Sequence, residues 1–304
     1  MKVSIIGVGN VGAACAQRLA EAGVDEIALV DIIPALAQGK ALDILESAPL
    51  VGFSGKLTGT STYQETASSD LVIVTSGASR KPGMDRLDLL RLNKSIITEV
   101  AGKVAEFSPN AIIIMVTNPV EAMTYLAQGI TGWERERVIG LSGLLDGARF
   151  SAFVAQELGT SPSEVKTWVL GEHGEGMVVL SRLTTVSDKP LEEMLPPEKI
   201  SQLIERTRNG GAEIVELLKS ASASVAPSAA VFRMAESILY DKKEVMTASF
   251  YLKGEYGIKD SILSVPLKLG RKGVEGVIEL DLNSAEKDAL VKAAAKVNQT
   301  LTSI

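Results

Sequence analysis

Five short runs of β-branched and other apolar residues recur in the first half of the chain, and they constrain the fold more than any other feature. Longer segments with helical spacing separate them. Nearly continuous apolar strands between helices are typical of a parallel sheet that is covered on both faces. We therefore predict an α/β fold with an N-terminal doubly wound parallel sheet of the Rossmann type. The runs are KVSIIGVG, EIALVDI, DLVIVTSGA, AIIIMVTNP and RVIGLSG.

The regular alternation of predicted strands and helices ends at about residue 145, which predicts a second domain of α+β character. Two domains also suit a chain of 304 residues, because single cores stop growing at about this size. We place the domains at 1–145 and 146–304, joined by a tight crossing from strand to helix and packed around a cleft. The predicted helices are 144–158, 196–220, 227–241 and 284–304; the predicted strands are 165–174 and 177–186, which could pair as an antiparallel ribbon, and 245–252 and 276–280.

Charge and cysteine content exclude several classes of function. The chain has 37 acidic and 31 basic residues and no long run of one charge, so we expect no nucleic-acid partner. Its only cysteine, Cys15, cannot form an intrachain disulfide, and no segment has the spacing of a zinc site. We expect a cytoplasmic protein without a metal and without a membrane span. The first residues resemble a secretory leader, but glycines and Asn10 interrupt the apolar run.

A glycine pattern follows the first predicted strand directly. Gly7, Gly9 and Gly12 form G-x-G-x-x-G before a helix that begins at about Asn10. Gly7 would allow a tight turn, and Gly9 would let a pyrophosphate approach the main chain closely. Gly12 would allow the helix to pack closely against the strand. Asp31 ends the second strand, where a carboxylate accepts hydrogen bonds from ribose hydroxyls and repels a 2′-phosphate. The pattern predicts NAD rather than NADP, although Asp31 by itself could simply cap a turn.

Two further segments end strands at the ligand-binding edge of the predicted sheet. Residues 75–78 reach this edge, and a loop with Pro82 and Gly83 follows, which could close over a substrate. The cations in and after the loop, Arg80, Lys81 and Arg86, could instead be ordinary solvated side chains. Asn118 ends the next strand before a proline, a pair that is also a common turn signal.

An acid, a cation and the only histidine of the chain complete the candidate residues. Asp146 and Arg149 are three apart in a predicted helix and share one face, so they could form a simple ion pair. His173 stands in GEHG, after a predicted strand that would bring it to the cleft. A single histidine is often structural, but glycines after it allow backbone and ligand to approach closely.

Six elements together resemble one family. IIGVGNVG, Asp31, SRKPGMDRLDL, VTNP, LLDGAR and GEHG occur in the order and at the spacings of the lactate and malate dehydrogenases, over nearly the whole chain. The chain is most similar to the malate dehydrogenases whose sequences are like those of lactate dehydrogenases.

The resemblance implies a role for each catalytic candidate. His173 would donate or accept the proton at the substrate oxygen, and Asp146 would fix its tautomer and favour the imidazolium form. Arg149 would pair with the substrate C1 carboxylate, and Arg86 would polarise the reacting carbonyl. Asn118 would hold both the nicotinamide end of the cofactor and the substrate.

The resemblance also implies the substrate and the remaining cofactor contacts. The family has arginine at the position of Arg80 where the substrate has a second carboxylate, as in oxaloacetate and malate, and glutamine where it is pyruvate or lactate. Arg80 therefore predicts malate. A homo-oligomer, a dimer or a tetramer, is the implied assembly. The NAD contacts would come from Gly7, Gly9, Asn10, Val11, Gly12, Asp31, Thr75, Ser76, Gly77, Asn93, Val116 and Asn118.

One segment departs from the family pattern. Residues 220–225 read SASASV where relatives often have glycine, serine, alanine and two tyrosines, so small side chains should border the substrate pocket.

Two other functions are alternatives to a malate dehydrogenase: a dehydrogenase for lactate or a bulkier 2-hydroxy acid, and a non-catalytic NAD-binding protein. An NAD-dependent glycosidase on a related fold would need metal ligands, which one cysteine and one histidine hardly supply.

Overall fold

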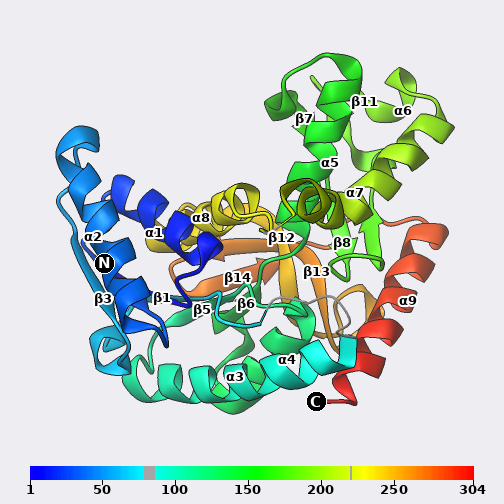
Figure 1. Ribbon diagram of the computed structural model, residues 1–304. Helices are drawn as coiled ribbons and strands as arrows, with labels where there is room; N and C mark the ends of the chain where they lie inside the picture. The colour runs from blue at the N-terminus through cyan, green and yellow to red at the C-terminus, as the bar shows by residue number, and fades with distance from the viewer. Residues whose placement is uncertain (79–85, 220) are drawn as a thin grey trace.

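The computed structural model describes residues 1–78, 86–219 and 221–304, and a twisted sheet runs through its whole length (Figure 1). Among these residues the sheet has eleven strands in the order β3-β2-β1-β4-β5-β6-β12-β13-β8-β9, with β14 beside β13. The first six are parallel, which confirms the predicted doubly wound sheet. They are β1 (Lys2–Ile6), β2 (Glu26–Val30), β3 (Lys56–Thr60), β4 (Leu71–Val74), β5 (Ile112–Met115) and β6 (Val138–Gly140).

The second half of the chain extends the same sheet with antiparallel strands. Strand β12 joins β6 through the pair Ser249 and Gly140. The predicted ribbon is present as β8 against β9, while β7, β10 and β11 form a separate small sheet. The strands are β7 (Val165–Lys166), β8 (Val169–Gly171), β9 (Met177–Val179), β10 (Thr185–Val186), β11 (Lys189–Pro190), β12 (Glu244–Lys253), β13 (Lys259–Gly270) and β14 (Gly273–Val277).

Helices cover both faces of the parallel half. The helices α1 and α8 pack together on one face, and α3 packs on α4 on the other, as Figure 1 shows. No helix in the described ranges is long and apolar enough to cross a membrane. The helices are α1 (Asn10–Glu21), α2 (Pro34–Val51), α3 (Arg86–Phe107), α4 (Val120–Thr131), α5 (Gly143–Leu158), α6 (Leu191–Met194), α7 (Pro197–Leu218), α8 (Val225–Leu239) and α9 (Ser284–Leu301).

Three strands were not predicted: β3, β13 and the two-residue β11. Strand β3 is rich in threonine and glycine and lies half-exposed at the sheet edge, so it lacks an apolar run. Strand β13 contains Pro266, which normally argues against an internal strand because it has no N–H to donate. Its carbonyl still accepts from the Ile278 N–H at 2.8 Å, so pairing with β14 continues past it. The predicted strand 276–280 overlaps β14 in only two residues, Gly276 and Val277.

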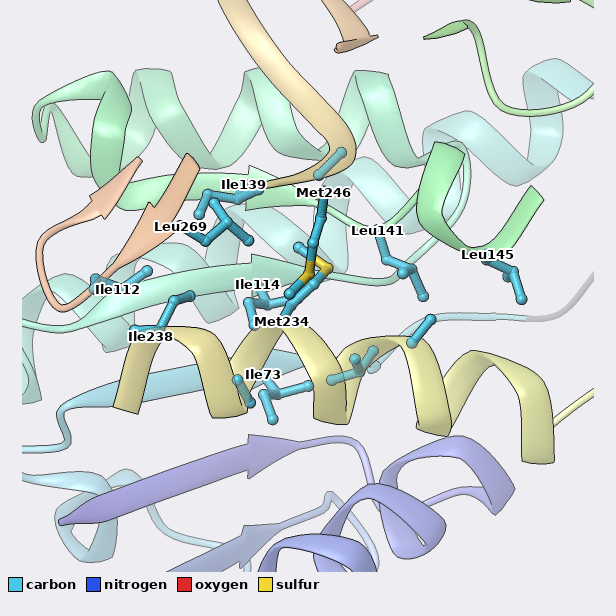
Figure 2. Close-up of a cluster of buried hydrophobic side chains, with 14 of the residues drawn as sticks. Ile73, Ile112, Ile114, Ile139, Leu141, Leu145, Met234, Ile238, Met246 and Leu269 are labelled. Carbon is cyan, nitrogen blue, oxygen red and sulfur yellow. The ribbon is translucent and has the colours of Figure 1, made fainter. Parts of the chain in front are cut away.

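Helix α8 belongs to the second half of the sequence but packs on the sheet of the first half. Its Met234 lies beside Ile114 of β5 and its Ile238 beside Ile112 of the same strand (Figure 2). Full burial of an aliphatic side chain stabilises a fold by about 1.5–3 kcal/mol, so this contact holds α8 firmly. This packing places the first turn of α8, and Ser222 and Ala223 before it, beside the cleft that is described below. Cys15 of α1 lies in the same core and has no exposed surface.

The predicted boundary between the two domains falls within helix α5. Strand β6 ends at Gly140 and α5 begins at Gly143, so the crossing from strand to helix is short, and residue 145 lies in the first turn of α5. Because α5 continues to Leu158, it carries residues on both sides of the predicted division.

Candidate active site

The turn between β1 and α1 is too closely packed for a side chain at two positions, Gly7 and Gly12. Gly7 has φ +94°, and a Cβ on it would lie 2.4 Å from the Ser76 main-chain nitrogen. A Cβ on Gly12 would lie 2.1 Å from the Gly7 carbonyl oxygen. The Thr75 hydroxyl donates to the same oxygen at 2.6 Å. The turn is therefore locked between β1, β4 and α1 by main-chain contacts.

Gly9 differs from its two neighbours because it borders open space. A Cβ at this position would meet no atom within 4 Å. It precedes Asn10 and Val11, the first residues of α1, whose N–H groups point out of the helix start and carry partial positive charge. An open surface above a helix N-terminus fits the pyrophosphate of a dinucleotide.

Asp31 connects the end of β2 to the glycine turn. Its Oδ2 accepts from the Val8 N–H at 2.8 Å and its Oδ1 from the Ile33 N–H at 3.1 Å. The carboxylate therefore does cap a turn, and it is also fixed beside the glycine turn, where a ribose hydroxyl could donate to it. The cofactor site predicted from the sequence is thus compatible with NAD in its local geometry.

The ends of β4 and β5 are held together by Asn93 of α3. Its Nδ2 donates to the Asn118 carbonyl at 2.7 Å, and its Oδ1 accepts from the Ala78 N–H at 2.8 Å. The Thr117 hydroxyl donates to the Ser76 carbonyl at 2.6 Å. Asn93 has no exposed surface, and its side chain hydrogen-bonds the main chain of both segments.

A cleft of about 410 Å³ lies between the two halves of the chain, and eight of the predicted residues line it. Ser222 and Ala223 also line it, as expected for the segment that departs from the family pattern. Arg80 and Lys81 lie outside the described residues, as does Ser220. Arg86 is the first residue of α3, and its side chain is not described. The predicted residues that line the cleft are Val11, Thr75, Gly77, Val116, Asn118, Asp146, Arg149 and His173.

His173 and Asp146 are in direct contact within this cleft. His173 Nδ1 lies 2.8 Å from Asp146 Oδ2, and the Asp146 side chain is only 1% exposed. Burial of the ring acts to lower the pKa of His173, but the charge and hydrogen bond of Asp146 outweigh it, so the net pKa is raised. A ring held in this way can exchange a proton through its other nitrogen, Nε2.

Arg149 completes the cluster from the same helix as Asp146. Its Nη1 lies 3.3 Å from Asp146 Oδ1. Its Nε is buried and, among the described residues, has no hydrogen-bond partner. Gly210 of α7 packs closely beside it, since a Cβ there would lie 3.3 Å from Arg149 Cδ, whereas a Cβ on Gly211 would make an ordinary contact of 3.6 Å with Arg149 Nη2. A buried guanidinium with an unused donor suits a ligand carboxylate.

One buried acid of the site was not predicted. Glu121 of α4 accepts from the His173 main-chain N–H at 2.9 Å and from the Ser249 hydroxyl at 3.1 Å, both at Oε1. Burial raises the pKa of Glu121 to about 7. Its sequence position, two residues after Pro119, is that of an ordinary acidic residue at a helix start. No local signal connects it with a histidine 52 positions further on.

Two family models together match nearly the whole chain. Residues 1–140 match the model described as "lactate/malate dehydrogenase, NAD binding domain". Residues 144–304 match that described as "lactate/malate dehydrogenase, alpha/beta C-terminal domain".

Similar proteins and structures agree with these models. The chain is 47% identical to a malate dehydrogenase of Methanosarcina mazei, over 100% of this chain and 99% of that protein. It is similar to a malate dehydrogenase structure from Salinibacter ruber (TM-score 0.95, 42% identity, 100% of this chain and 97% of that one). A lactate dehydrogenase from Cryptosporidium parvum, in complex with lactic acid and nicotinamide adenine dinucleotide, has a TM-score of 0.96 at 35% identity, over 99% of this chain and 96% of that one.

Proposed function

The chain belongs to the lactate/malate dehydrogenase family, and on this premise we propose that it is an NAD-dependent malate dehydrogenase, which interconverts malate and oxaloacetate. The observation that carries the proposal is the contact of His173 with Asp146 in a cleft that also reaches the glycine turn of an NAD-binding domain. Two relatives of 47% and 42% identity that are named malate dehydrogenase support the choice of substrate.

We infer that His173 moves the proton of the reaction. Bound NAD⁺ would supply a hydride acceptor for the hydroxyl-bearing carbon of malate, and NADH would supply the hydride donor for oxaloacetate. The neutral ring of His173 takes the hydroxyl proton on Nε2, while Nδ1–H donates to Asp146 Oδ2 across 2.8 Å. In the reverse direction the imidazolium gives this proton to the keto oxygen. The raised pKa of His173 favours the imidazolium and therefore supports reduction of oxaloacetate.

The arginines would bind and polarise the substrate. Arg149 offers its buried Nε to the C1 carboxylate, and a guanidinium can hold a carboxylate through two parallel hydrogen bonds. Arg86 stands at the start of α3 and would stabilise negative charge on the reacting oxygen. Asn118 is exposed in the cleft and would contact the nicotinamide end of the cofactor as well as the substrate.

Arg80 would decide between malate and lactate. The overall fold does not discriminate, because a lactate dehydrogenase and a malate dehydrogenase have nearly the same TM-score to this chain. A buried arginine without a partner carboxylate destabilises a complex by several kcal/mol, so pyruvate would bind poorly beside Arg80. The alternative is a dehydrogenase for lactate or a bulkier 2-hydroxy acid, which the small Ser222 and Ala223 at the cleft would admit.

The test is NADH oxidation with oxaloacetate, pyruvate and 2-oxoglutarate, repeated with Arg80→Gln. We expect oxaloacetate to be the preferred substrate, and the ratio of kcat/KM for oxaloacetate to that for pyruvate to fall at least about 10²-fold in Arg80→Gln. Lys287→Gln, at an exposed site of α9, serves as a control for loss of one positive charge. Folded, NADH-binding protein without oxaloacetate activity would refute malate dehydrogenase activity.

We also propose a cytoplasmic homo-oligomer with a division between NAD-binding and substrate domains at residues 145 and 146. The single, buried Cys15 supports a reducing compartment. Exposed apolar side chains on α2 are candidates for the contact between subunits, among them Leu42 (55% exposed) and Leu50 (87%). Sedimentation velocity of the wild type and of Leu42→Glu would test this assembly, with a dimer or tetramer expected for the wild type and a smaller species for the variant.

A further inference from the structure

Glu121 and His173 form a contact between a helix and a loop that the mechanism above does not use. Glu121 is the second residue of α4 and is only 5% exposed. Its Oε1 accepts the His173 main-chain N–H at 2.9 Å and the Ser249 hydroxyl at 3.1 Å. Ser249, on β12, in turn lies 2.8 Å from the Ser142 hydroxyl. The acid thus links α4, the histidine loop and the centre of the sheet.

Main-chain hydrogen bonds close the base of the loop that carries His173: the Glu172 N–H donates to the Gly176 carbonyl and the Met177 N–H to the Gly174 carbonyl, each at 3.2 Å. Gly171 and Gly174 have φ +91° and +112°, values that glycine adopts without strain and other residues rarely do. A Cβ on Gly174 would meet no atom within 4 Å, so packing does not fix the loop on that side. Side chains from other elements further fix the main chain and the ring of His173.

Two such restraints flank His173. Asp146 of α5 holds the ring through Nδ1, whereas Glu121 of α4 holds the main-chain nitrogen. The neighbouring Glu172 pairs with Lys296 of α9 at 2.8 Å, which fixes the residue before the histidine. Each of these contacts comes from a different helix.

A buried carboxyl at this place needs an explanation, because it is unfavourable to bury. Burial raises the pKa of Glu121 to about 7, which shows how strongly the surroundings oppose its charge. An apolar residue in a helix start would be less costly to bury and would stabilise the fold more. The two hydrogen bonds at Oε1 do not require the charge, since the carbonyl oxygen of a protonated carboxyl also accepts.

We propose that Glu121 is a positioning residue for His173, which fixes the main chain of the histidine while Asp146 orients its ring, and whose charge favours the imidazolium. This inference rests on the proposed role of His173 as the proton donor and acceptor. Proton transfer depends on donor and acceptor atoms at hydrogen-bond distance, and a misplacement of about 1 Å can lower a rate on the order of 10²-fold.

The charges around the histidine determine how Glu121 acts on its pKa. Asp146 and Glu121 favour the imidazolium, and Arg149 opposes it. Glu172 also lies near Glu121, but its charge is paired with Lys296. The side chains of Arg80 and Arg86 would add positive charge and are outside the described part of the site. Removal of the Glu121 charge should therefore lower the pKa of His173.

Two variants separate the hydrogen bonds from the charge. Glu121→Gln keeps an oxygen that can accept both hydrogen bonds but has no charge, whereas Glu121→Ala removes both. We expect kcat for oxaloacetate reduction to fall about 10- to 10²-fold in Glu121→Ala, with NADH affinity unchanged, and to stay within about threefold of the wild type in Glu121→Gln. Thr124→Val is the matched control: Thr124 is buried in the same helix, and among the described residues its hydroxyl bonds only the Val120 carbonyl, so kcat should not change.

The only histidine of the chain allows a second measurement that needs no turnover. An NMR titration of the ring reports on His173 alone, and its pKa should be lower in Glu121→Gln than in the wild type. The descending limb of the pH profile for reduction should move to lower pH with it, because reduction needs the imidazolium. Amide hydrogen exchange at His173 should be faster in Glu121→Ala than in Thr124→Val.

The proposal requires both results. Equal kcat in Glu121→Ala and Glu121→Gln, or an unchanged His173 pKa in Glu121→Gln, would overturn it. If Glu121→Ala does not fold, which circular dichroism and NADH binding would reveal, the titration of Glu121→Gln still decides. Absence of oxaloacetate turnover in the wild type would refute the proposed function instead, and would leave the titration and the exchange measurement as tests of the Glu121 contact.

Discussion

The glycine turn after β1 and the histidine loop after β8 both depend on glycines with positive φ, but they are held in different ways. In the turn, Gly7 and Gly12 are confined by main-chain atoms of Ser76 and Gly7 that would lie within 2.4 Å of an added Cβ. In the loop, Gly174 borders open space, and side chains from α4 and α5 hold His173. The cofactor site is therefore built mainly from main chain, and the catalytic site mainly from distant side chains.

This difference determines which changes each site tolerates. A side chain added to the turn must displace main chain and so disturb the fold near α1. A side chain removed from the loop restraints leaves the fold largely intact and disturbs the chemistry. Variants at the two sites should therefore separate cofactor binding from turnover.

The largest effect is expected for Asp146→Asn. The amide has the same shape, but it lacks the charge that favours the imidazolium, and it can present either its oxygen or its NH₂ group to Nδ1 of His173. We expect kcat to fall about 10²- to 10⁴-fold, since this is the typical contribution of positioned acid–base catalysis. The remaining activity for reduction should shift to lower pH, because the raised pKa of His173 depends on Asp146. NADH fluorescence titration should give the wild-type affinity. A kcat within threefold of the wild type would mean that the ring does not need its carboxylate.

The same comparison explains what the sequence could predict. The glycine turn and Asp31 were predicted from local spacing, because a main-chain site is formed by residues that are close in sequence. Strand β13 was missed, since Pro266 hides it and its pairing with β12 is decided by the sheet as a whole.

The catalytic residues needed more than local pattern. Asp146 and Arg149 by themselves fit a simple helical ion pair, and only the resemblance to a family connected them with His173. Glu121 remained unpredicted, because an acid at a helix start is common, and its burial beside His173 follows only from the packing of α4 against β12. Long-range contacts of this kind depend on the complete fold.

A smaller effect is expected for Gly12→Ala, with Gly9→Ala as its matched control. A Cβ on Gly12 would lie 2.1 Å from the Gly7 carbonyl oxygen and 2.9 Å from the Thr75 hydroxyl, so main chain must move. We expect a loss of about 1–3 kcal/mol in the free energy of unfolding, together with weaker NADH binding. Gly9→Ala should unfold like the wild type, because its Cβ meets nothing, yet it should also bind NADH less tightly. Denaturant unfolding and NADH titration of both variants measure this. If the two variants unfold alike, the turn is less rigid than its main-chain contacts indicate.

The smallest effect is expected for Asp31→Asn, which tests whether the cofactor site uses a side chain at all. Asp31 accepts from the Val8 N–H at Oδ2 and from the Ile33 N–H at Oδ1, and an amide can keep only one of these bonds because its nitrogen does not accept. We expect a loss of about 1 kcal/mol in the free energy of unfolding. NADH should bind about tenfold less tightly, while NADPH, no longer repelled by a carboxylate, should lose less or gain. The ratio of the two dissociation constants is therefore more informative than either one. An unchanged ratio would show that Asp31 only caps the turn, and cofactor choice would then lie in the main chain of the glycine turn.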